Sequence, residues 1–222
     1  SVRCKKAQAG IVITASHNPS GYNGYKLYDE NGCQFVPHLA ERVAYFMETK
    51  EDYFAFNLED YRSLLHKGLV TELYETCDKC YLTFLNKLHP RVNVNKDFKV
   101  VYSPLHGTGY AYGAKILRDL GFNVYEVTAQ RILDPNFATV KSPNPEVKEA
   151  FTLAEALGHK EKAALLLATD PDGDRLGVAV LHKDTYIYLD GSLLGSLLLD
   201  YLIKINPPQK GAVMMTTIVT PK

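Results

Sequence analysis

Between residues 98 and 189, short apolar runs alternate with longer amphipathic stretches, and this alternation limits the folds open to the chain. The short runs suit buried strands, and the stretches between them suit helices. The predicted elements are strand Phe98–Tyr102, helix Tyr110–Leu120, strand Asn123–Val127, helix Glu146–Gly158, strand Ala163–Ala168, and a hairpin of Gly177–Leu181 with Thr185–Leu189. This order predicts an α/β fold with a mixed, largely parallel sheet and flanking helices.

Further elements are predicted on both sides of this region. They are strands Ala9–Thr14 and Gly24–Tyr28, helices Pro37–Thr49, Thr71–Leu88 and Ser192–Ile205, and strand Ala212–Val219. We therefore expect three parts, residues 1–65, 66–185 and 186–222. The first strand is apolar enough to be buried, and neither it nor the last strand has a clear partner. We therefore expect the 222 residues to be a piece of a longer protein.

Charge and hydropathy argue against two classes of protein. The 25 basic residues balance the 25 acidic residues, whereas nucleic-acid binders usually carry a basic excess. The longest apolar stretch, Leu193–Leu202, is interrupted by Gly195, Ser196 and Asp200 and is shorter than a membrane span of about 18 residues. The first ten residues lack the apolar core of a signal peptide. We expect a cytoplasmic protein that binds neither nucleic acid nor membrane.

The four cysteines are expected to be reduced thiols, as in most cytoplasmic proteins. Cys77 and Cys80 form a C-x-x-C pair, but no second pair supplies the other two ligands of a zinc site. Both lie within the predicted helix Thr71–Leu88. We interpret them as ordinary helix residues.

Three aspartates follow the predicted strand Ala163–Ala168. Asp170, Asp172 and Asp174 alternate along the loop, so their carboxylates face one side and repel one another unless a cation lies among them. Hard oxygen ligands favour magnesium, calcium or manganese. An EF-hand loop would need glycine and glutamate where this chain has Arg175 and Leu181. We expect a metal site here, with a solvated acidic turn as the alternative.

A second polar loop follows the predicted strand Ala9–Thr14. It contains Ser16, His17 and Asn18, without the G-x-S-x-G pattern of hydrolases. A serine beside a metal can carry a phosphoryl group, because a divalent cation offsets its nearly two negative charges. The serine and aspartate loops suit that chemistry if they meet across a cleft. The same residue types are also common in simple turns, so composition leaves both interpretations open.

Together these segments resemble the α-D-phosphohexomutase superfamily, which contains phosphoglucomutases and phosphomannomutases. The resemblance rests on "TASHNP" at residues 14–19, "NGYK" at 23–26 and "DPDGDR" at 170–175. The segments "SPLHGTG" (103–109) and "ATVKSPNPE" (138–146) are similar to the branch with phosphoglucomutase and phosphopentomutase-type enzymes. The resemblance covers nearly the whole chain.

The resemblance implies a magnesium-dependent phosphoryl transfer. Ser16 would carry the phosphoryl group, and Asp170, Asp172 and Asp174 would bind Mg²⁺ together with a phosphoserine oxygen. The phosphoserine would donate to a sugar monophosphate. The reaction would convert glucose 1-phosphate to glucose 6-phosphate through glucose 1,6-bisphosphate.

The resemblance also implies roles for four residues near these loops. His17 would assist Ser16 in catalysis, and Asn18 would contact the phosphate beside it. Lys26 would act as a general acid or base, and Arg175 would orient the phosphate. An exposed lysine on a hairpin is the alternative interpretation of Lys26.

The chain departs from the family in extent. Complete members have four domains, with a sugar-reading G-E-x-S-G loop in the third and a phosphate-binding loop of serine, glycine and threonine in the fourth. Neither pattern occurs in the 222 residues. The resemblance thus implies the second part of domain 1, all of domain 2 and the start of domain 3. We expect this portion alone to be inactive.

Two other functions stay open at this stage. Asp170-Pro171-Asp172-Gly173 also resembles the D-x-D-G-T motif of haloacid dehalogenase-type phosphatases, in which the first aspartate is phosphorylated, but Asp174 replaces the threonine. The chain could also be a metal-binding structural piece without turnover. The sequence names neither the sugar, whether glucose, mannose or pentose phosphate, nor the oligomeric state.

Overall fold

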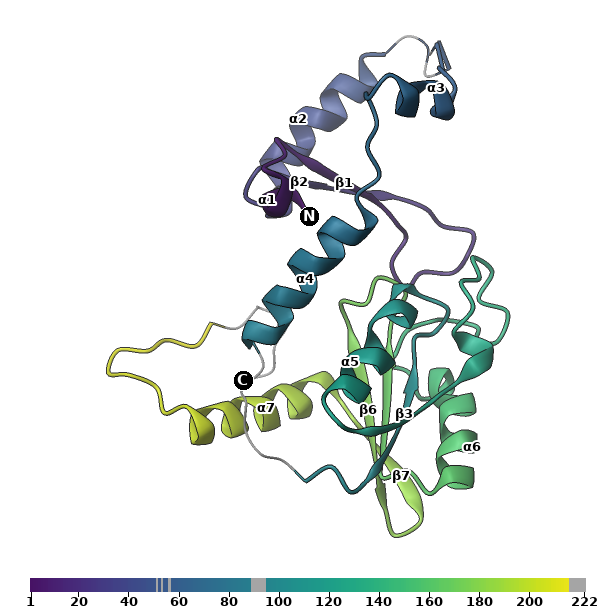
Figure 1. Cartoon of the computed structure of the whole chain (residues 1–222), viewed down its shortest axis with the longest axis vertical. Helices are drawn as coiled ribbons and strands as arrows, with labels where there is room; N and C mark the ends of the chain where they lie inside the picture. Colours follow the sequence, from purple (N-terminus) through teal and green to yellow (C-terminus); the bar gives the residue numbers. More distant parts are fainter. Residues whose placement is uncertain (51, 53, 56, 89–94, 216–222) are drawn as a thin grey trace. The chain divides into compact units, whose positions relative to one another are not determined.

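The computed structural model describes residues 1–50, 52, 54–55, 57–88 and 95–215 (Figure 1). The chain divides into two compact units. Unit 1 comprises Ser1–Ile13 and Gly24–Pro90, and unit 2 comprises Thr14–Asn23 and Arg91–Lys222. The serine loop, residues 14–23, therefore belongs with unit 2, although the two strands that it connects belong to unit 1.

Unit 1 combines a small hairpin with helices. Its elements are α1 (Val2–Lys5), β1 (Gly10–Ile13), β2 (Tyr25–Tyr28), α2 (Pro37–Glu48), α3 (Tyr61–His66) and α4 (Tyr74–Leu88). Strands β1 and β2 pair antiparallel, with Gly10 opposite Tyr28 and Ile13 opposite Tyr25. The expectation that the first strand is buried is wrong here, since Ile11 is 68% exposed and Ile13 is 74% exposed. Within the described residues this sheet has two strands, so no third strand covers their apolar side chains.

Two helices of unit 1 are joined covalently. Cys4 of α1 forms a disulfide with Cys80 of α4, and their Cα atoms are 6.6 Å apart. The expectation of four reduced thiols is therefore wrong for this pair, while Cys33 and Cys77 are free. The two residues are 76 positions apart, so their spacing in the sequence carried no sign of the bond.

Unit 2 is built on a five-stranded mixed sheet in the order β4-β3-β5-β6-β7. The strands are β3 (Lys99–Ser103), β4 (Asn123–Glu126), β5 (Leu165–Thr169), β6 (Leu176–His182) and β7 (Thr185–Leu189). Strand β3 pairs in parallel with both β4 and β5, whereas β5-β6 and β6-β7 are antiparallel. The α/β fold with a mixed sheet and the predicted hairpin are confirmed.

Helices cover both faces of this sheet, as expected when successive strand residues point to opposite sides. On one face Val101 and Leu166 pack with Phe151 and with Ala154 of α6 (Thr152–Glu161). On the other face Val100, Tyr102 and Val124 pack with Ala114 of α5 (Gly113–Asp119). Figure 1 shows α5 and α6 on either side of the strands.

Several predicted helices differ in detail. The predicted helix 146–158 is split into a 3-10 turn, η3 (Lys148–Phe151), and α6. The predicted helix 110–120 is split into η1 (Thr108–Ala111) and α5, and a short turn η2 covers Thr128–Gln130. The predicted strand 212–219 is wrong for residues 212–215, which pair with no strand of the described sheets, and its remaining residues lie outside the described part.

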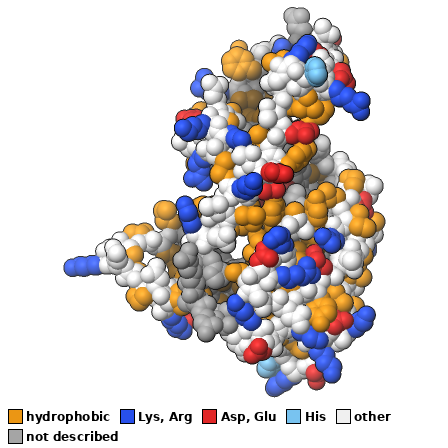
Figure 2. Space-filling model, in the orientation of Figure 1, with side chains coloured by type: hydrophobic (Ala, Val, Ile, Leu, Met, Phe, Trp, Pro, Cys, Tyr) orange, Lys and Arg blue, Asp and Glu red, His pale blue; other side chains and the backbone are white. Residues whose placement is uncertain are grey.

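Helix α7 (Gly191–Ile205) follows the sheet. Its first turn is capped by Asp190, whose carboxylate accepts a hydrogen bond from Leu193 N at 2.8 Å. None of the helices in the described ranges combines the length and apolar character needed to cross a bilayer. On the face shown in Figure 2, Lys and Arg side chains lie among Asp and Glu side chains, in keeping with the zero net charge.

Candidate active site

The two parallel strands β3 and β5 end at the same edge of the unit 2 sheet. Polar loops leave both strands there, residues 103–109 after β3 and residues 170–175 after β5. In α/β sheets this carboxyl edge is the usual place for ligands. The acidic loop that the sequence singled out therefore lies where a ligand site is expected.

The acidic loop is fixed against its neighbour. Pro171 O accepts hydrogen bonds from Thr108 N and Thr108 Oγ1, both at 2.9 Å. Gly107 lies so close to Pro171 that a Cβ on Gly107 would overlap the Pro171 backbone. The glycine and threonine of "SPLHGTG" thus hold the start of the acidic loop in place.

Asp170 is the centre of the acidic loop and its side chain is completely buried. Its Oδ1 accepts hydrogen bonds from Asp174 N at 3.1 Å and Arg175 N at 3.0 Å. Gly173, at φ +74°, closes the turn by donating its N–H to Asp170 O at 3.0 Å. Burial raises the pKa of the Asp170 carboxyl, the hydrogen bond from Arg175 N opposes this, and the nearby Asp174 and Asp172 charges raise it further.

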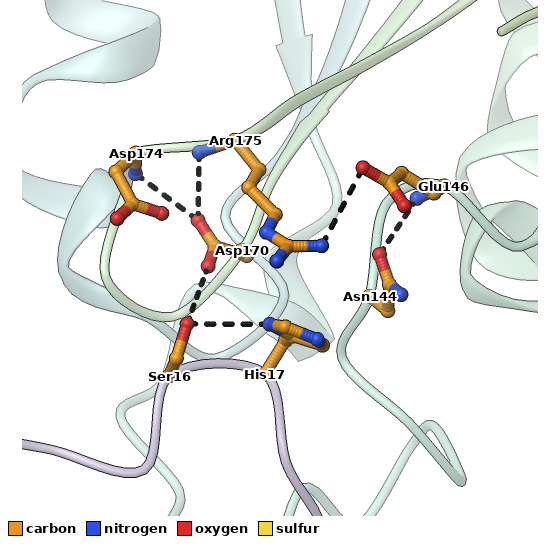
Figure 3. Close-up of polar contacts among 7 residues, drawn as sticks. All are labelled: Ser16, His17, Asn144, Glu146, Asp170, Asp174 and Arg175. Atoms are coloured by element: carbon orange, nitrogen blue, oxygen red, sulfur yellow. Dashed lines mark hydrogen bonds and ion pairs between the residues drawn. The ribbon is translucent and has the colours of Figure 1, made fainter. Parts of the chain in front are cut away.

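The serine loop meets this turn within unit 2. Ser16 Oγ lies 3.4 Å from Asp170 Oδ2 and 3.2 Å from His17 Nδ1 (Figure 3). Thr14 Oγ1 accepts a hydrogen bond from Ser16 N at 2.8 Å and donates one to Asp172 Oδ1 at 2.5 Å. Ser16 itself adopts a left-handed conformation, with φ +56°. The two loops that the sequence analysis paired are therefore joined by side-chain hydrogen bonds.

The other predicted site residues, Arg175, Asn18 and Lys26, lie at different distances along the chain from the acidic turn. Arg175 follows the acidic turn, and its guanidinium Nη1 lies 3.4 Å from Glu146 Oε1 (Figure 3). Asn18 N donates to Ala15 O at 3.1 Å, which closes a turn around Ser16 and His17. Lys26 lies on β2 of unit 1, opposite Val12 in the register. The structure thus brings Ser16, His17 and the acidic loop together, and it places Lys26 in the other unit.

Among the described residues, the acidic loop has the donor chemistry of a metal site but not its geometry. In the part of the chain that the structure describes, no three His, Cys, Asp or Glu side chains are gathered closely enough to hold an ion. The chemistry of the loop nevertheless fits a hard cation, because a buried carboxylate has two acidic neighbours that raise its pKa. A divalent cation would offset that repulsion, and carboxylate and hydroxyl oxygens are the donors it prefers.

Sequence reasoning assigned no role to three residues around this site. Thr14 links the serine and acidic loops, Glu146 pairs with Arg175, and His106 anchors the loop after β3. Each lies inside one of the segments that resemble the family. That resemblance was the feature of the sequence that could have pointed to these residues. Their contacts reach residues 26 to 158 positions away and could not be seen locally.

His106 shows how the loop after β3 is held. Its Nδ1 lies 2.9 Å from Ile132 O and its Nε2 lies 2.7 Å from Thr139 Oγ1. A carbonyl only accepts, so Nδ1 carries the proton and Nε2 accepts from the threonine hydroxyl. Gln130 Nε2 donates to the same hydroxyl at 3.1 Å, and Gln130 Oε1 accepts from Ser103 Oγ at 2.6 Å. Both ring nitrogens are used in this buried network, so His106 serves the scaffold of the site.

Comparisons with known proteins agree with this arrangement. The models for phosphoglucomutase/phosphomannomutase, alpha/beta/alpha domains I and II, match residues 1–54 and 79–183, together more than half of the chain. A curated phosphoglucomutase of Staphylococcus haemolyticus is 37% identical over 226 residues, covering 99% of this chain and 40% of that protein. The chain thus spans about 40% of the length of the curated relatives that it matches.

Solved structures share the fold. A Thermus thermophilus structure described as a phosphomannomutase superposes with a TM-score of 0.68 at 22% identity, covering 92% of this chain and 43% of the other. A phosphoglucomutase/phosphomannomutase family protein from Burkholderia thailandensis gives a TM-score of 0.60 at 23% identity, covering 90% and 38%. The serine and acidic loops, the family models and the shared fold agree: the chain belongs to the phosphoglucomutase/phosphomannomutase family.

Proposed function

We propose that this chain carries the phosphoserine half of a magnesium-dependent phosphohexomutase. The observation that supports this most directly is the contact between the two loops, with Ser16 Oγ 3.4 Å from Asp170 Oδ2. A serine beside a buried carboxylate in an acidic loop suits transient phosphorylation, because phosphoryl transfer depends mainly on positioning and on neutralising charge. The curated relatives are named phosphoglucomutase, which favours glucose phosphates as substrates.

The proposed reaction has two half-reactions. In the first, a sugar hydroxyl attacks the phosphorus of phosphorylated Ser16, so that a new P–O bond to the sugar forms and the bond to Ser16 Oγ breaks. The hydroxyl proton passes to a general base, and the product is glucose 1,6-bisphosphate. In the second, Ser16 Oγ attacks the phosphorus of the other phosphate of the reoriented bisphosphate, so that a bond to Ser16 Oγ forms and the bond from that phosphorus to the sugar oxygen breaks. The serine proton passes to the general base, and the released sugar oxygen takes a proton in return. This releases glucose 6-phosphate when glucose 1-phosphate was the substrate, and the phosphoserine is restored.

Protein groups would assist these steps in different ways. His17 Nδ1, 3.2 Å from Ser16 Oγ, holds a hydrogen bond to the hydroxyl and assists its proton transfer. Lys26 is proposed as the general base for the sugar hydroxyl. Asn18 and Arg175 are proposed to contact the phosphate, which suits the several donors of a guanidinium.

Magnesium is the proposed cofactor. Asp170, Asp172 and Asp174, with an oxygen of phosphorylated Ser16, would hold it. When bound, it would offset the charge of the phosphoryl group and the carboxylates. The raised pKa of Asp170 supports this choice, since it reflects a buried carboxylate beside two acidic neighbours.

The proposed function also implies a domain assignment, a cellular location and a set of ligands. We propose that residues 1–65 belong to the serine-bearing domain 1, residues 66–185 to the metal-loop domain 2, and residues 186–222 to the start of domain 3. We also propose a cytoplasmic location, where sugar phosphates are found. Glucose 1-phosphate, glucose 6-phosphate and glucose 1,6-bisphosphate are the proposed ligands.

Intact-mass spectrometry after incubation with magnesium and glucose 1,6-bisphosphate tests the proposal. We expect the mass of the complete wild-type protein to rise by one phosphate and that of its Ser16→Ala variant to stay unchanged. Ser20→Ala, which removes an exposed hydroxyl of the same loop, is the matched control and should be phosphorylated like the wild type. Labelling at Asp170 would instead indicate a phosphoaspartate phosphatase, and an unmodified wild type would contradict the proposal.

A further inference from the structure

Glu146 has no role in the function proposed above, yet it contacts one of its residues. Its Oε1 lies 3.4 Å from Arg175 Nη1, and Figure 3 shows the Arg175 side chain extending from the acidic turn toward Glu146. The backbone N–H of Arg175 meanwhile donates to Asp170 Oδ1 at 3.0 Å. Arg175 therefore connects the buried carboxylate beside Ser16 to an acidic residue on another loop.

The backbone on both sides of this ion pair is closely held. Pro143 and Pro145 are buried, and Asn144 Oδ1 accepts a hydrogen bond from Glu146 N at 3.0 Å. Gly177 lies two residues after Arg175, at the start of β6, where a Cβ would overlap the Pro145 carbonyl oxygen. The segment that carries Glu146 is thus packed directly against the strand that Arg175 precedes, which fixes where the carboxylate can reach the guanidinium.

The position of the pair indicates that it does more than stabilise the fold. The Glu146 side chain is 60% exposed and that of Arg175 is 38% exposed, and ion pairs exposed to this extent contribute little to folding. Such a pair can still restrict the direction of a long side chain. A guanidinium has five N–H donors in a planar fork, so one carboxylate contact leaves donors for a second anion.

We propose that Glu146 is a positioning residue that holds the Arg175 guanidinium in the direction needed to bind the phosphoryl group at Ser16. The inference rests on the proposed function for the identity of that anion. Without Glu146, the Arg175 side chain would turn toward the acidic loop, whose carboxylates compete with phosphate for its donors. The contact thus keeps the arginine available for an incoming phosphate.

Two physical effects of Glu146 predict opposite results, which makes the inference testable. As a negative charge, Glu146 repels an incoming anion, so its neutralisation alone would tighten phosphate binding. As a positioning residue, it orders the arginine, so its removal would weaken binding. Glutamine keeps an oxygen that can accept from the guanidinium, whereas alanine keeps none.

The experiment is a titration of the 222-residue chain with inorganic phosphate, followed by the NMR signal of the Arg175 side-chain N–H. We expect Glu146→Ala to weaken phosphate binding about threefold to tenfold and Glu146→Gln to give an intermediate loss. Glu149→Gln, three positions away and also exposed, is the matched control and should bind like the wild type. Melting temperatures of the four proteins should agree closely, since the pair is exposed.

Three outcomes would overturn the inference. They are tighter binding in both Glu146 variants, equal binding in all four proteins, and a wild type whose Arg175 signal does not respond to phosphate. Phosphorylation of Ser16 is measured separately by mass, so a failure of the proposed function would be recognised independently of this titration.

Discussion

The carboxylate of Asp170 is completely buried. Two backbone N–H groups and the Ser16 hydroxyl contact it, and Asp172 and Asp174 add like charges nearby. Burial is the largest cause of its raised pKa. The residue is therefore held in a place where its charge is costly to the fold, as is common for groups that serve a ligand.

The sign of the pH effect follows from this shift. Because folding raises the pKa of Asp170 above its ordinary value of 3.8, its contribution to stability is present below that value and is lost as pH rises through the folded pKa. In the absence of divalent cations, we expect Asp170→Asn to raise the melting temperature more at pH 7.5 than at pH 4.5. Asparagine retains an oxygen for the two backbone donors.

Thermal unfolding of both proteins at the two pH values checks this expectation. Asp184→Asn, at an exposed turn between β6 and β7, is the control and should change the melting temperature equally at both. If Asp170→Asn melted at a lower temperature than the wild type at pH 7.5, the raised pKa of Asp170 would be contradicted.

Asp172 provides a direct test of the proposed metal site. Asp172→Asn removes one negative charge but keeps an oxygen for the hydrogen bond from Thr14, so the loop contact should survive. We expect calorimetric titration with magnesium to show binding weakened on the order of tenfold or more, since ligand charge sets cation affinity. Asp184→Asn should bind as the wild type does. Equal magnesium binding in Asp172→Asn and wild type would count against the site.

At the scale of elements, the site depends on two loops that leave neighbouring parallel strands. Strands β3 and β5 bring residues 103–109 beside residues 170–175, and Thr108 donates twice to Pro171 O. A side chain cannot be added at Gly107 without moving the acidic loop. The loop after β3 therefore holds the loop after β5 in place.

Gly107→Ala tests this support. The new Cβ would overlap the Pro171 backbone, so we expect a loss of about 1–3 kcal/mol in the free energy of unfolding and weaker magnesium binding. Gly195→Ala, inside helix α7 with open space around it, is the matched control and should stabilise by about 0.5–1 kcal/mol. Urea unfolding of the three proteins distinguishes these results, and a neutral Gly107→Ala would show that the loops can separate.

At the scale of the whole chain, the Cys4–Cys80 disulfide closes a long loop between two helices of unit 1. The bond links residues 76 positions apart. Disulfides typically stabilise by about 2–4 kcal/mol. We expect Cys80→Ser, or reduction of the wild type, to lower the melting temperature, while Cys77→Ser should leave it nearly unchanged.

Alkylation in denaturant provides an independent measure of the same bond. Without reductant, Cys33 and Cys77 should react, and with reductant all four cysteines should react. Four reactive cysteines before reduction would show that the bond is absent in solution.

Catalytic turnover also depends on the extent of the chain. The 222 residues span about 40% of the length of the curated relatives. A mutase must hold a bisphosphorylated sugar at both ends while its orientation reverses. We expect the 222 residues alone to fall short of a full-length relative by about two to six powers of ten, from two or three missing charge-assisted contacts. A coupled assay for glucose 6-phosphate measures this. Turnover near that of a full-length phosphoglucomutase would show that the distal contacts are unnecessary.

The sequence by itself determined the strands of unit 2 and the two loops of its candidate site. Periodicity placed the strands and the β6-β7 hairpin, because a buried strand must carry apolar residues at close spacing. The motifs identified Ser16 and the acidic loop, since few residue types can carry or neutralise a phosphoryl group. Local sequence did not reveal the split of the helix 146–158 or the absence of a strand at 212–215, because packing and strand partners decide these.

Only the tertiary structure decided which of these residues meet. The contacts of Ser16 with Asp170 and of Thr14 with Asp172 join residues more than 150 positions apart, and the Cys4–Cys80 bond crosses 76. No local pattern encodes such a contact. Each joins segments that are distant in the sequence, so it forms only when the fold brings those segments together. The sequence therefore indicated the candidate residues, and the fold specified the distances between them.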